Sequence, residues 1–332
     1  RAMAEWAELT GRAYARASGY RLKDPEYVLA GQGSIVPNLE VTADWLREER
    51  GIKVGVLNVT MFRPFPADLI TNLLTGKKAV TVFERCDQPL AVDPPLLREI
   101  RAAMTKGLEN WRAAAGRGKK ARKSSAAGNG ARAGMVPFPS LAEISPDGFP
   151  DFHSAGFGFG SRDVQPGDIV AAAENMLPTG AGRRQYYLGI DFIRKGTRLP
   201  KLRIWQERLL DAYPHLEGLA LESAGDVNLL PPGSTAIRIH SVGGWGAITM
   251  GKNLTMTAFE LFGMHVKANP KYGSEKKGQP TTFYSVLSHE PIKLNAELKH
   301  VNVVLSPDGN VFLHSAPLAG MEEGGAFIIQ SH

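Results

Sequence analysis

One stretch in the last third of the chain has the residue types and spacing of a phosphate-binding loop. Residues 246–252 read G-A-I-T-M-G-K, which matches G-x-x-x-x-G-K, and Asn253 follows where such loops carry Ser or Thr. In nucleotide-hydrolysing loops the backbone N–H groups wrap the phosphates, and the hydroxyl binds Mg²⁺. Ile248 and Thr249 are β-branched and resist the positive φ angles of such a loop, and Asn253 has no hydroxyl. The sequence therefore predicts that this stretch does not support ATP hydrolysis.

A shorter glycine loop at residues 243–246 is the alternative interpretation. The apolar run 236–242 predicts a strand, and apolar residues at helical spacing predict a helix that begins at Ala247. Gly251 would then lie one turn into this helix, where the missing side chain permits close packing on a sheet. Such a loop can offer backbone N–H groups and a helix dipole to an anion, or it can serve only as a tight turn. Both functions stay open at this point.

Cysteine and histidine usage limits the metal chemistry of the chain. Cys86 is the only cysteine, so this chain has no disulfide framework and no four thiolates for a [4Fe–4S] cluster or structural zinc. The eight histidines show no H-E-x-x-H motif, and no metal site is predicted. Cys86 ends a predicted strand, where open sheets bind ligands, but a buried structural thiol is the favoured interpretation. We identify no catalytic residue and expect a reducing, cytoplasmic location.

The positive charge of the chain is concentrated in one segment. The formal net charge is +6, and residues 111–134 contain seven basic residues and no acidic one, which leaves −1 for the remainder. This segment is rich in Ala, Gly and Ser without apolar periodicity, so it predicts a flexible basic insertion. Docking to RNA or to an acidic protein is the alternative, although the neutral remainder argues against nucleic acid. No apolar run approaches the length of a membrane helix, and no membrane partner is expected.

Alternating short apolar runs and helical patterns predict an α/β fold for residues 1–110. Strands are expected at residues 27–34, 53–62 and 78–85, and helices at 39–51, 66–74 and 94–108. Asn38 is expected to cap the first of these helices. Strands that alternate with helices predict a parallel sheet with both faces covered.

The remaining sequence predicts three further segments. Residues 111–150 form the basic flexible insertion, residues 151–235 form a connecting segment, and residues 236–332 form a second domain that is truncated at its C-terminus. The predicted architecture is therefore two Rossmann-like domains, each containing a parallel sheet, joined by an irregular connecting region.

The order of several short motifs resembles a known family. The motifs comprise Gly243, Gly244 and Gly246, then Tyr272, Gly273, Glu275, Lys277 and Gly278, and finally Ser288, Pro291 and Ile292. They resemble the gamma domain of 2-oxoacid:ferredoxin oxidoreductases. The first region, with R-P-F-P at 63–66, resembles the transketolase C-terminal-like domain (domain II) of these enzymes. Residues 156–192 resemble the link between these domains in single-chain pyruvate:ferredoxin oxidoreductases.

This resemblance implies an oxidoreductase function. Enzymes of the family oxidatively decarboxylate a 2-oxoacid to its acyl-CoA and reduce ferredoxin or flavodoxin. They use thiamine diphosphate, Mg²⁺, [4Fe–4S] clusters and coenzyme A. The chain has neither the G-D-G…N thiamine diphosphate motif nor a cysteine quartet. It is therefore expected to act with the remaining domains or subunits of a homo-oligomeric enzyme, and to be inactive alone.

Coenzyme A is the ligand that the resemblance assigns to the gamma domain. Contacts are expected from Gly243, Gly244, Trp245, Gly246, Lys252, Lys276 and Lys277. Trp245 stands where the family usually has Gln or Asp, and Gln279 replaces a glycine of the second motif. Trp245 either covers a ligand or packs in an interface, and each lysine either contacts phosphate or is a surface charge.

Two further functions remain as alternatives. A non-catalytic assembly or binding module would retain the same scaffold without the chemistry. A NAD-dependent dehydrogenase would also have a glycine loop after a strand, but it requires an acidic residue about 20 positions later, at the end of a second strand. Glu260 falls inside the predicted helix instead, which disfavours this alternative.

Overall fold

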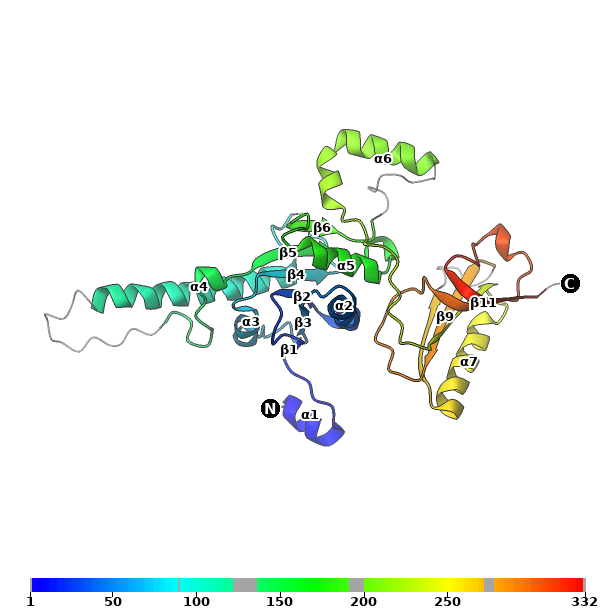
Figure 1. Ribbon diagram of the computed structural model, residues 1–332, viewed down its shortest axis with the longest axis horizontal. Coiled ribbons are helices and arrows are strands. Elements are labelled where there is room, and N and C mark those ends of the chain that lie inside the picture. Colours follow the sequence, from blue (N-terminus) through cyan, green and yellow to red (C-terminus); the bar gives the residue numbers. More distant parts are fainter. Residues whose placement is uncertain (1, 89, 122–135, 191–199, 272–277, 331–332) are drawn as a thin grey trace. The chain divides into compact units, whose positions relative to one another are not determined.

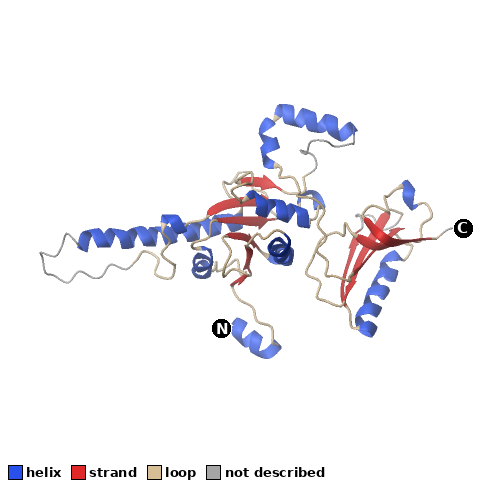
Figure 2. Ribbon diagram, in the orientation of Figure 1, coloured by secondary structure: helices blue, strands red, loops and turns tan. Residues whose placement is uncertain are grey.

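The chain divides into two compact units, Arg1–Gly225 and Asp226–His332. The structure is a computed structural model that describes residues 2–88, 90–121, 136–190, 200–271 and 278–330 (Figure 1). Each unit has its own β-sheet with helices beside it (Figure 2). The predicted α/β class is confirmed, and both sheets are mixed because each contains antiparallel pairing. Within the described ranges, no helix combines the length and apolar character needed to cross a bilayer.

A six-stranded sheet with the order β1-β3-β2-β4-β5-β6 forms the centre of the first unit. Its strands are β1 (Ala17–Tyr20), β2 (Tyr27–Gly31), β3 (Val54–Val59), β4 (Ala79–Glu84), β5 (Asp151–Gly156) and β6 (Gln185–Tyr187). All neighbours pair in parallel except the edge strand β1, which is antiparallel to β3. The central strands β2, β3 and β4 are buried along most of their length, as expected for a sheet covered on both faces.

The helices of the first unit lie on both faces of this sheet. They are α2 (Val36–Glu49), α3 (Ala67–Leu74), α4 (Pro95–Ala121) and α5 (Pro166–Asn175), with α1 (Ala2–Thr10) and α6 (Pro200–Ala212) outside the layers. Helix α2 packs beside α5 on one face, and α3 packs beside α4 on the other (Figure 1). The start predicted for the first of these helices was wrong, because α2 begins at Val36 and Asn38 is buried in its first turn.

The segment predicted as connecting structure contributes directly to the first sheet. Strand β5 pairs along its length with β4, and β6 pairs with β5, so residues 151–187 continue the sheet rather than link two domains. The sequence of β5, DFHSAG, contains few of the β-branched and aromatic residues that mark strands. Segment 151–156 therefore forms a strand because it pairs with β4, and its own composition does not indicate one.

Part of the predicted flexible insertion is helical. Helix α4 continues to Ala121, because its Ala, Arg and Lys residues favour a helix and no proline interrupts it. Residues 122–135, with the remaining basic residues of that prediction, lie outside the described part. Asn110 fixes the chain that follows, since its side-chain amide donates to the carbonyl oxygens of Phe138 and Leu141 and accepts from the Phe138 N–H.

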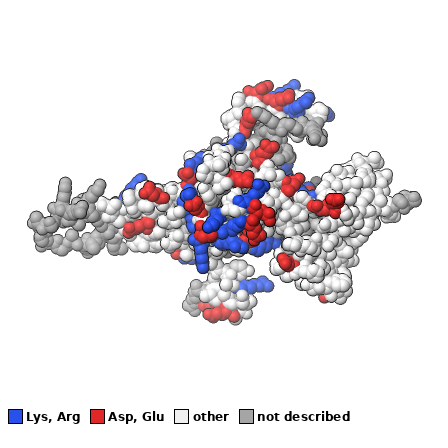
Figure 3. All heavy atoms as spheres, viewed as in Figure 1, with Lys and Arg blue, Asp and Glu red and all other residues white. Residues whose placement is uncertain are grey.

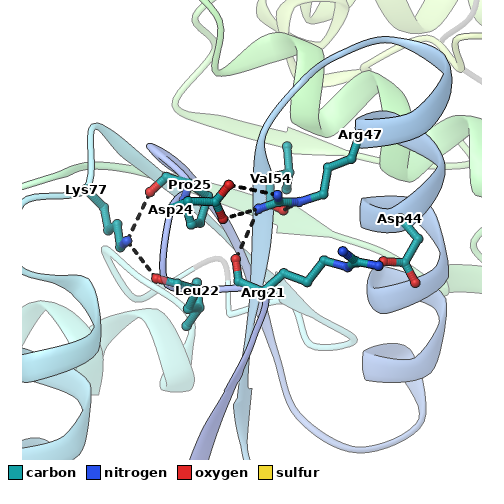
Figure 4. Close-up of polar contacts among 8 residues, drawn as sticks. All are labelled: Arg21, Leu22, Asp24, Pro25, Asp44, Arg47, Val54 and Lys77. Carbon is teal, nitrogen blue, oxygen red and sulfur yellow. Dashed lines mark hydrogen bonds and ion pairs between the residues drawn. The ribbon is translucent and has the colours of Figure 1, made fainter.

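Arg47 of α2 fixes the loop between β1 and β2 (Figure 4). Its guanidinium donates to both carboxylate oxygens of Asp24, at 2.9 and 3.1 Å, and to the backbone oxygens of Arg21 and Val54. Lys77 Nζ donates to two further carbonyl oxygens of the same loop, each at 3.0 Å. These contacts hold the loop so that the chain can reverse from the edge strand β1 into the central strand β2.

The second unit is a five-stranded sheet with the order β11-β10-β7-β9-β8. Its strands are β7 (Thr235–Val242), β8 (His265–Lys271), β9 (Pro280–Ser288), β10 (Val301–Ser306) and β11 (Met321–Ile329), and its helix is α7 (Ala247–Phe262). Strands β7, β10 and β11 are parallel, and β9 is antiparallel to β7 and to β8. The chain leaves β7 through α7 toward β8 on one side, while β10 and β11 lie on the other. The carboxyl ends of β7 and β10 are therefore neighbours at the point where the strand order reverses.

The two faces of this sheet have separate cores. Ile237 and Ile239 pack with Ala247 of α7 and with Phe283 on one face. Because side chains alternate along a strand, the neighbouring positions of β7 point to the opposite face, where the second core contains Ala236. Helix α7 therefore covers one face, and loop segments cover the other.

Candidate functional site

The glycine loop of the second unit joins β7 directly to α7. Gly244 and Gly246 have φ angles of 100° and 83°, and Gly246 is the residue before the first turn of α7. These left-handed conformations suit glycine, since a β-carbon would be strained there. Ile248 and Thr249 lie inside the helix, so residues 246–252 do not form a nucleotide-hydrolysing loop. The structure instead contains the shorter glycine loop at residues 243–246, followed directly by α7.

Gly251 lets α7 approach the sheet closely, as its spacing predicted. A β-carbon on Gly251 would lie 2.3 Å from the Phe283 ring of β9. One turn further, the hydroxyl groups of Thr255 and Ser285 are 3.0 Å apart. Small residues thus bring the helix axis near β9, and this close packing fixes the position of the glycine loop.

Hydrogen bonds hold the loop at its base and leave its tip open. The Gly243 N–H donates to the Gln279 carbonyl at 2.8 Å, and the Gly278 N–H donates to the Gly243 carbonyl at 3.1 Å. The Trp245 N–H donates back to Val242 at 3.2 Å. Among the described residues no side chain caps α7, and the first N–H groups of a helix have no carbonyl partner within it. The tip of the loop therefore presents N–H groups that have no partner in the described part of the chain, at the positive end of the helix dipole.

A hollow of about 340 Å³ lies against these donors. It is lined by Gly243, Gly244 and Gly246 of the loop, by Ala247, Ile248 and Thr249 of the first turn of α7, and by Val242 and Thr281. Its size is within the range of small-molecule sites, and its walls combine backbone polar groups with apolar side chains. The arrangement can accept an anionic group such as a phosphate.

The predicted contact residues are only partly brought together. The four loop residues are contiguous, with Gly243, Gly244 and Gly246 lining the hollow and Trp245 exposed beside it. Lys252 is exposed on α7 and is the only basic residue of that helix. Figure 3 shows few Lys or Arg atoms on the face of the second unit in view. Lys276 and Lys277 lie outside the described residues.

A polar cluster that the sequence did not predict lies on the face opposite α7. It consists of Arg238, His240, Asp308 and His314. The guanidinium of Arg238 donates to the carbonyl oxygens of Pro317 and Ala319, which fixes the loop over this face. The one available sequence signal was the turn S-P-D-G-N at 306–310, which follows a strand and can therefore place Asp308 at a sheet edge.

The pKa values of Asp308 and His240 in this cluster are both lowered, for different reasons. Asp308 Oδ2 and His314 Nε2 are 2.6 Å apart, and this contact lowers the pKa of the Asp308 carboxyl group. His240 is 9% exposed, and its Nε2 has no hydrogen-bond partner within the described ranges. Burial, together with the charges of Arg238 and His314, lowers the pKa of His240 to about 4. His240 is therefore neutral at physiological pH.

Cys86 and the possible metal ligands were also considered in the sequence, and the structure shows where they lie. Cys86 is partly buried and follows the carboxyl end of β4. Glu84, the last residue of that strand, accepts hydrogen bonds from the N–H groups of Leu96 and Leu97 at the start of α4. Its carboxylate thus fixes the start of this helix. In the part of the chain described, no three His, Cys, Asp or Glu side chains are grouped to hold a metal.

Comparison with known proteins assigns both units to one group of enzymes. A family described as "Pyruvate ferredoxin/flavodoxin oxidoreductase" matches residues 236–332, and "Pyruvate:ferredoxin oxidoreductase core domain II" matches residues 25–123. Across almost the whole chain, 330 residues are 21% identical to the pyruvate:ferredoxin oxidoreductase of Moorella thermoacetica. The chain belongs to the 2-oxoacid:ferredoxin oxidoreductase family. The predicted resemblance is confirmed.

Two relatives in this family match separate portions of the chain. Pyruvate synthase subunit PorA of Thermotoga maritima is 38% identical over 100 residues, which are 30% of this chain and 25% of PorA. The common gamma subunit of the pyruvate/ketoisovalerate oxidoreductases of Thermococcus litoralis is 34% identical over 95 residues, 29% of this chain and 51% of that subunit. The match to the Moorella thermoacetica enzyme covers 99% of this chain and 23% of that protein. The chain therefore spans about a quarter of the length of PorA and of the Moorella thermoacetica enzyme.

Proposed function

We propose that the chain is part of an enzyme that oxidatively decarboxylates a pyruvate-like 2-oxoacid to its acyl-CoA and reduces ferredoxin or flavodoxin. The names of the relatives, pyruvate synthase and pyruvate:ferredoxin oxidoreductase, support pyruvate as the substrate class. The first unit would serve as scaffold, and the second would contribute contacts to coenzyme A. The other domains or subunits of the enzyme, together with its electron acceptor, would be the partners, in a cytoplasmic homo-oligomer.

The uncapped start of α7 is the observation that carries the coenzyme A role. Coenzyme A bears a diphosphate and a ribose phosphate, and phosphate oxygens accept hydrogen bonds from free backbone N–H groups at a helix N-terminus. The hollow of about 340 Å³ gives such a group room beside Gly244 and Gly246. Lys252 would add a cation within the first turns of the same helix. These residues would bind and orient the coenzyme without taking part in bond formation.

The remaining cofactors require donors that this chain does not have. A [4Fe–4S] cluster needs four thiolates, whereas the chain has Cys86 alone. We propose that thiamine diphosphate, its Mg²⁺ and the clusters are held by other portions of the enzyme. In such an enzyme thiamine diphosphate supplies the carbanion chemistry of decarboxylation. Backbone amides and a lysine suit a phosphate ligand better than a metal ion, and this donor set fits coenzyme A.

The test uses the enzyme that contains this chain, assayed as 2-oxoacid-dependent reduction of ferredoxin with coenzyme A. Lys252→Ala should raise the KM for coenzyme A roughly three- to tenfold, since a charge-assisted contact to phosphate is lost. The KM for the 2-oxoacid should not change. Lys23→Ala is the matched control, because Lys23 is an exposed lysine of the first unit.

Two outcomes would contradict the proposal separately. An enzyme that reduces no acceptor with any of several 2-oxoacids would exclude the oxidoreductase function. Equal KM values for coenzyme A in the Lys252→Ala and Lys23→Ala variants would exclude Lys252 as a phosphate contact.

A further inference from the structure

Helix α7 covers only part of the sheet face on which it lies. It packs on β7, β8 and β9, and among the described residues no α-helix packs along β10 or β11. These two strands are parallel to each other and to β7. Parallel strands in α/β folds are normally covered on both faces, because their crossover connections contain helices. The part of this face formed by β10 and β11 departs from that rule.

The pairing register shows which side chains this part of the face presents. Val303 and Leu305 of β10 pair with the two isoleucines of β7 that pack against α7, so they lie on the same face. Ala326 and Ile328 of β11 pair in turn with Val303 and Leu305. The position between them in β10, Val304, belongs to the core on the opposite face. We call Val303, Leu305, Ala326 and Ile328 the β10–β11 strip.

The four side chains of the β10–β11 strip are apolar, and none of them is fully buried. Val303 and Leu305 are partly buried at the edge of the core beneath α7, and Ala326 is exposed. Ile328 is 57% exposed, although isoleucine is among the residues that are most often buried. Contiguous exposed apolar side chains usually mark a surface that another protein element covers. The strip is therefore expected to be an interaction surface.

Exposed apolar side chains of α7 border this strip. Met250, Leu254 and Leu261 are 42%, 39% and 76% exposed and recur at helical spacing, so they form one side of the helix, which we call the α7 flank. The contacts of the helix with the sheet pass from β9 at Gly251 to the β7 core at Ala247. At about 100° per residue, continued rotation in the same direction reaches the α7 flank. The flank therefore lies on the β7 side of the helix, toward β10.

The dimensions of the β10–β11 strip fit one helix. Neighbouring strands are about 4.8 Å apart, so two strands provide a surface about 10 Å wide. Packed helices lie about 8–10 Å apart, so a second helix beside α7 would lie over β10 and β11. A β-strand is a poor occupant, because its backbone groups would have no hydrogen-bond partners on the face of a sheet.

The relatives of the chain contain enough sequence to supply such a helix. About half of the gamma subunit of Thermococcus litoralis, and most of the Moorella thermoacetica enzyme, lie outside the residues that this chain matches. A helix held within the same assembly also has a high effective concentration at the strip. This step rests on the proposed function, in which the chain acts together with other domains or subunits of one enzyme.

We propose that the β10–β11 strip and the α7 flank bind an amphipathic helix that another portion of the same enzyme supplies. This helix lies beside α7 and packs an apolar stripe, with residues spaced by about three, four and seven positions, against both surfaces. Its polar side faces away from the sheet. The second unit is thereby fixed to the rest of the enzyme through the face that α7 leaves uncovered.

The test uses the enzyme that contains this chain and identifies what touches the two surfaces. Ile328 of the strip and Leu254 of the flank are each replaced by the photo-cross-linking amino acid benzoylphenylalanine, and cross-linked peptides are sequenced by mass spectrometry. Both positions should cross-link to one segment outside this chain, at residues whose spacing is helical. Glu323, an exposed residue of β11 outside the strip, is the matched control position and should give little of this product.

A substitution in the strip gives a second readout. In the enzyme, Ile328→Asp should lower the melting temperature of the second unit by roughly 3–10 °C, because it places a charge in a covered apolar surface. In the 332-residue chain alone the shift should be below about 2 °C, since this side chain is 57% exposed there. Ile328→Val keeps the surface apolar and should shift the melting temperature of the enzyme less than Ile328→Asp does.

The outcomes that contradict the inference differ from those that contradict the proposed function. Cross-links to a second copy of this chain, to its own first unit, or to no peptide at all would overturn the inference. Cross-linked residues that alternate as in a strand, or equal shifts by Ile328→Asp in the enzyme and in the chain, would overturn it as well. The expected cross-links in an enzyme without 2-oxoacid-dependent activity would support the interface and exclude the proposed reaction.

Discussion

At the scale of single residues, His240 shows how the second unit depends on buried polar groups. It lies on β7 beneath the loop that Arg238 fixes, and its Nε2 has no partner in the described part of the chain. A neutral imidazole tolerates this position, whereas an imidazolium would lie in a poorly solvated site near Arg238 and His314. The lowered pKa is thus a consequence of the same packing that covers this face of the sheet.

This pKa predicts a pH-dependent stability of the second unit. His240 has a pKa of about 4 in the folded protein and 6.5 as its ordinary value, so between these pH values the unfolded chain binds more protons. The free energy of unfolding should therefore be highest above pH 6.5 and fall as the pH approaches 4, by about 3 kcal/mol. Urea unfolding at pH 7.0, 5.5 and 4.5, monitored through the second unit, measures this slope. His240→Gln should flatten it, and an unchanged slope in that variant would assign the effect to other groups.

At the scale of elements, α7 shows that a single glycine determines how a helix lies on its sheet. Gly251 faces the Phe283 ring at a distance that excludes a β-carbon. In contrast, a β-carbon on Gly116 of α4 would have no atom of the described residues within 4 Å. Replacement of each glycine by alanine separates the intrinsic gain in helix propensity from the cost of overpacking.

The two substitutions should have opposite signs. Gly116→Ala should stabilise the first unit by up to about 1 kcal/mol, because alanine favours the helix and no atom of the described residues blocks its methyl group. Gly251→Ala gains the same propensity but forces α7 away from Phe283, so a net destabilisation of roughly 1–3 kcal/mol is expected. Chemical denaturation of both variants measures these changes. A stabilised Gly251→Ala variant would show that α7 moves without cost, and that the glycine loop is less firmly positioned than its packing indicates.

The elements also show which parts of the fold can be predicted from sequence. The helix after the glycine loop and the close approach at Gly251 follow from local spacing, because periodicity and the absence of a side chain are local properties. Strand β5 is not predictable in this way, since pairing with β4 determines it. A hollow of about 650 Å³ that is lined by Trp245 and Asn310 is also non-local, because these residues are 65 positions apart and come together through the parallel pairing of β7 and β10.

At the scale of the whole molecule, the chain has two structural units that share no sheet. The large core of the first unit includes residues of β2, β3, β4, α3 and α4, and the cores of the second unit are built on β7, β9 and β10. The strands of each sheet therefore pair within their own unit, and each unit buries its own apolar side chains. Units of this kind can unfold independently, since cooperativity is a property of a shared core.

Calorimetric unfolding of the chain should show two transitions, each shifted by substitutions in one unit. Asn110→Ala removes three hydrogen bonds that hold residues 138–141, so it should cost about 1–3 kcal/mol and lower the melting temperature of the first unit by roughly 3–10 °C. Gly251→Ala should lower only the other transition. Addition of coenzyme A should raise the transition that Gly251→Ala lowers, because binding to the folded second unit stabilises it by mass action. One transition that moves with both substitutions would instead show that the two sheets unfold as a single cooperative body.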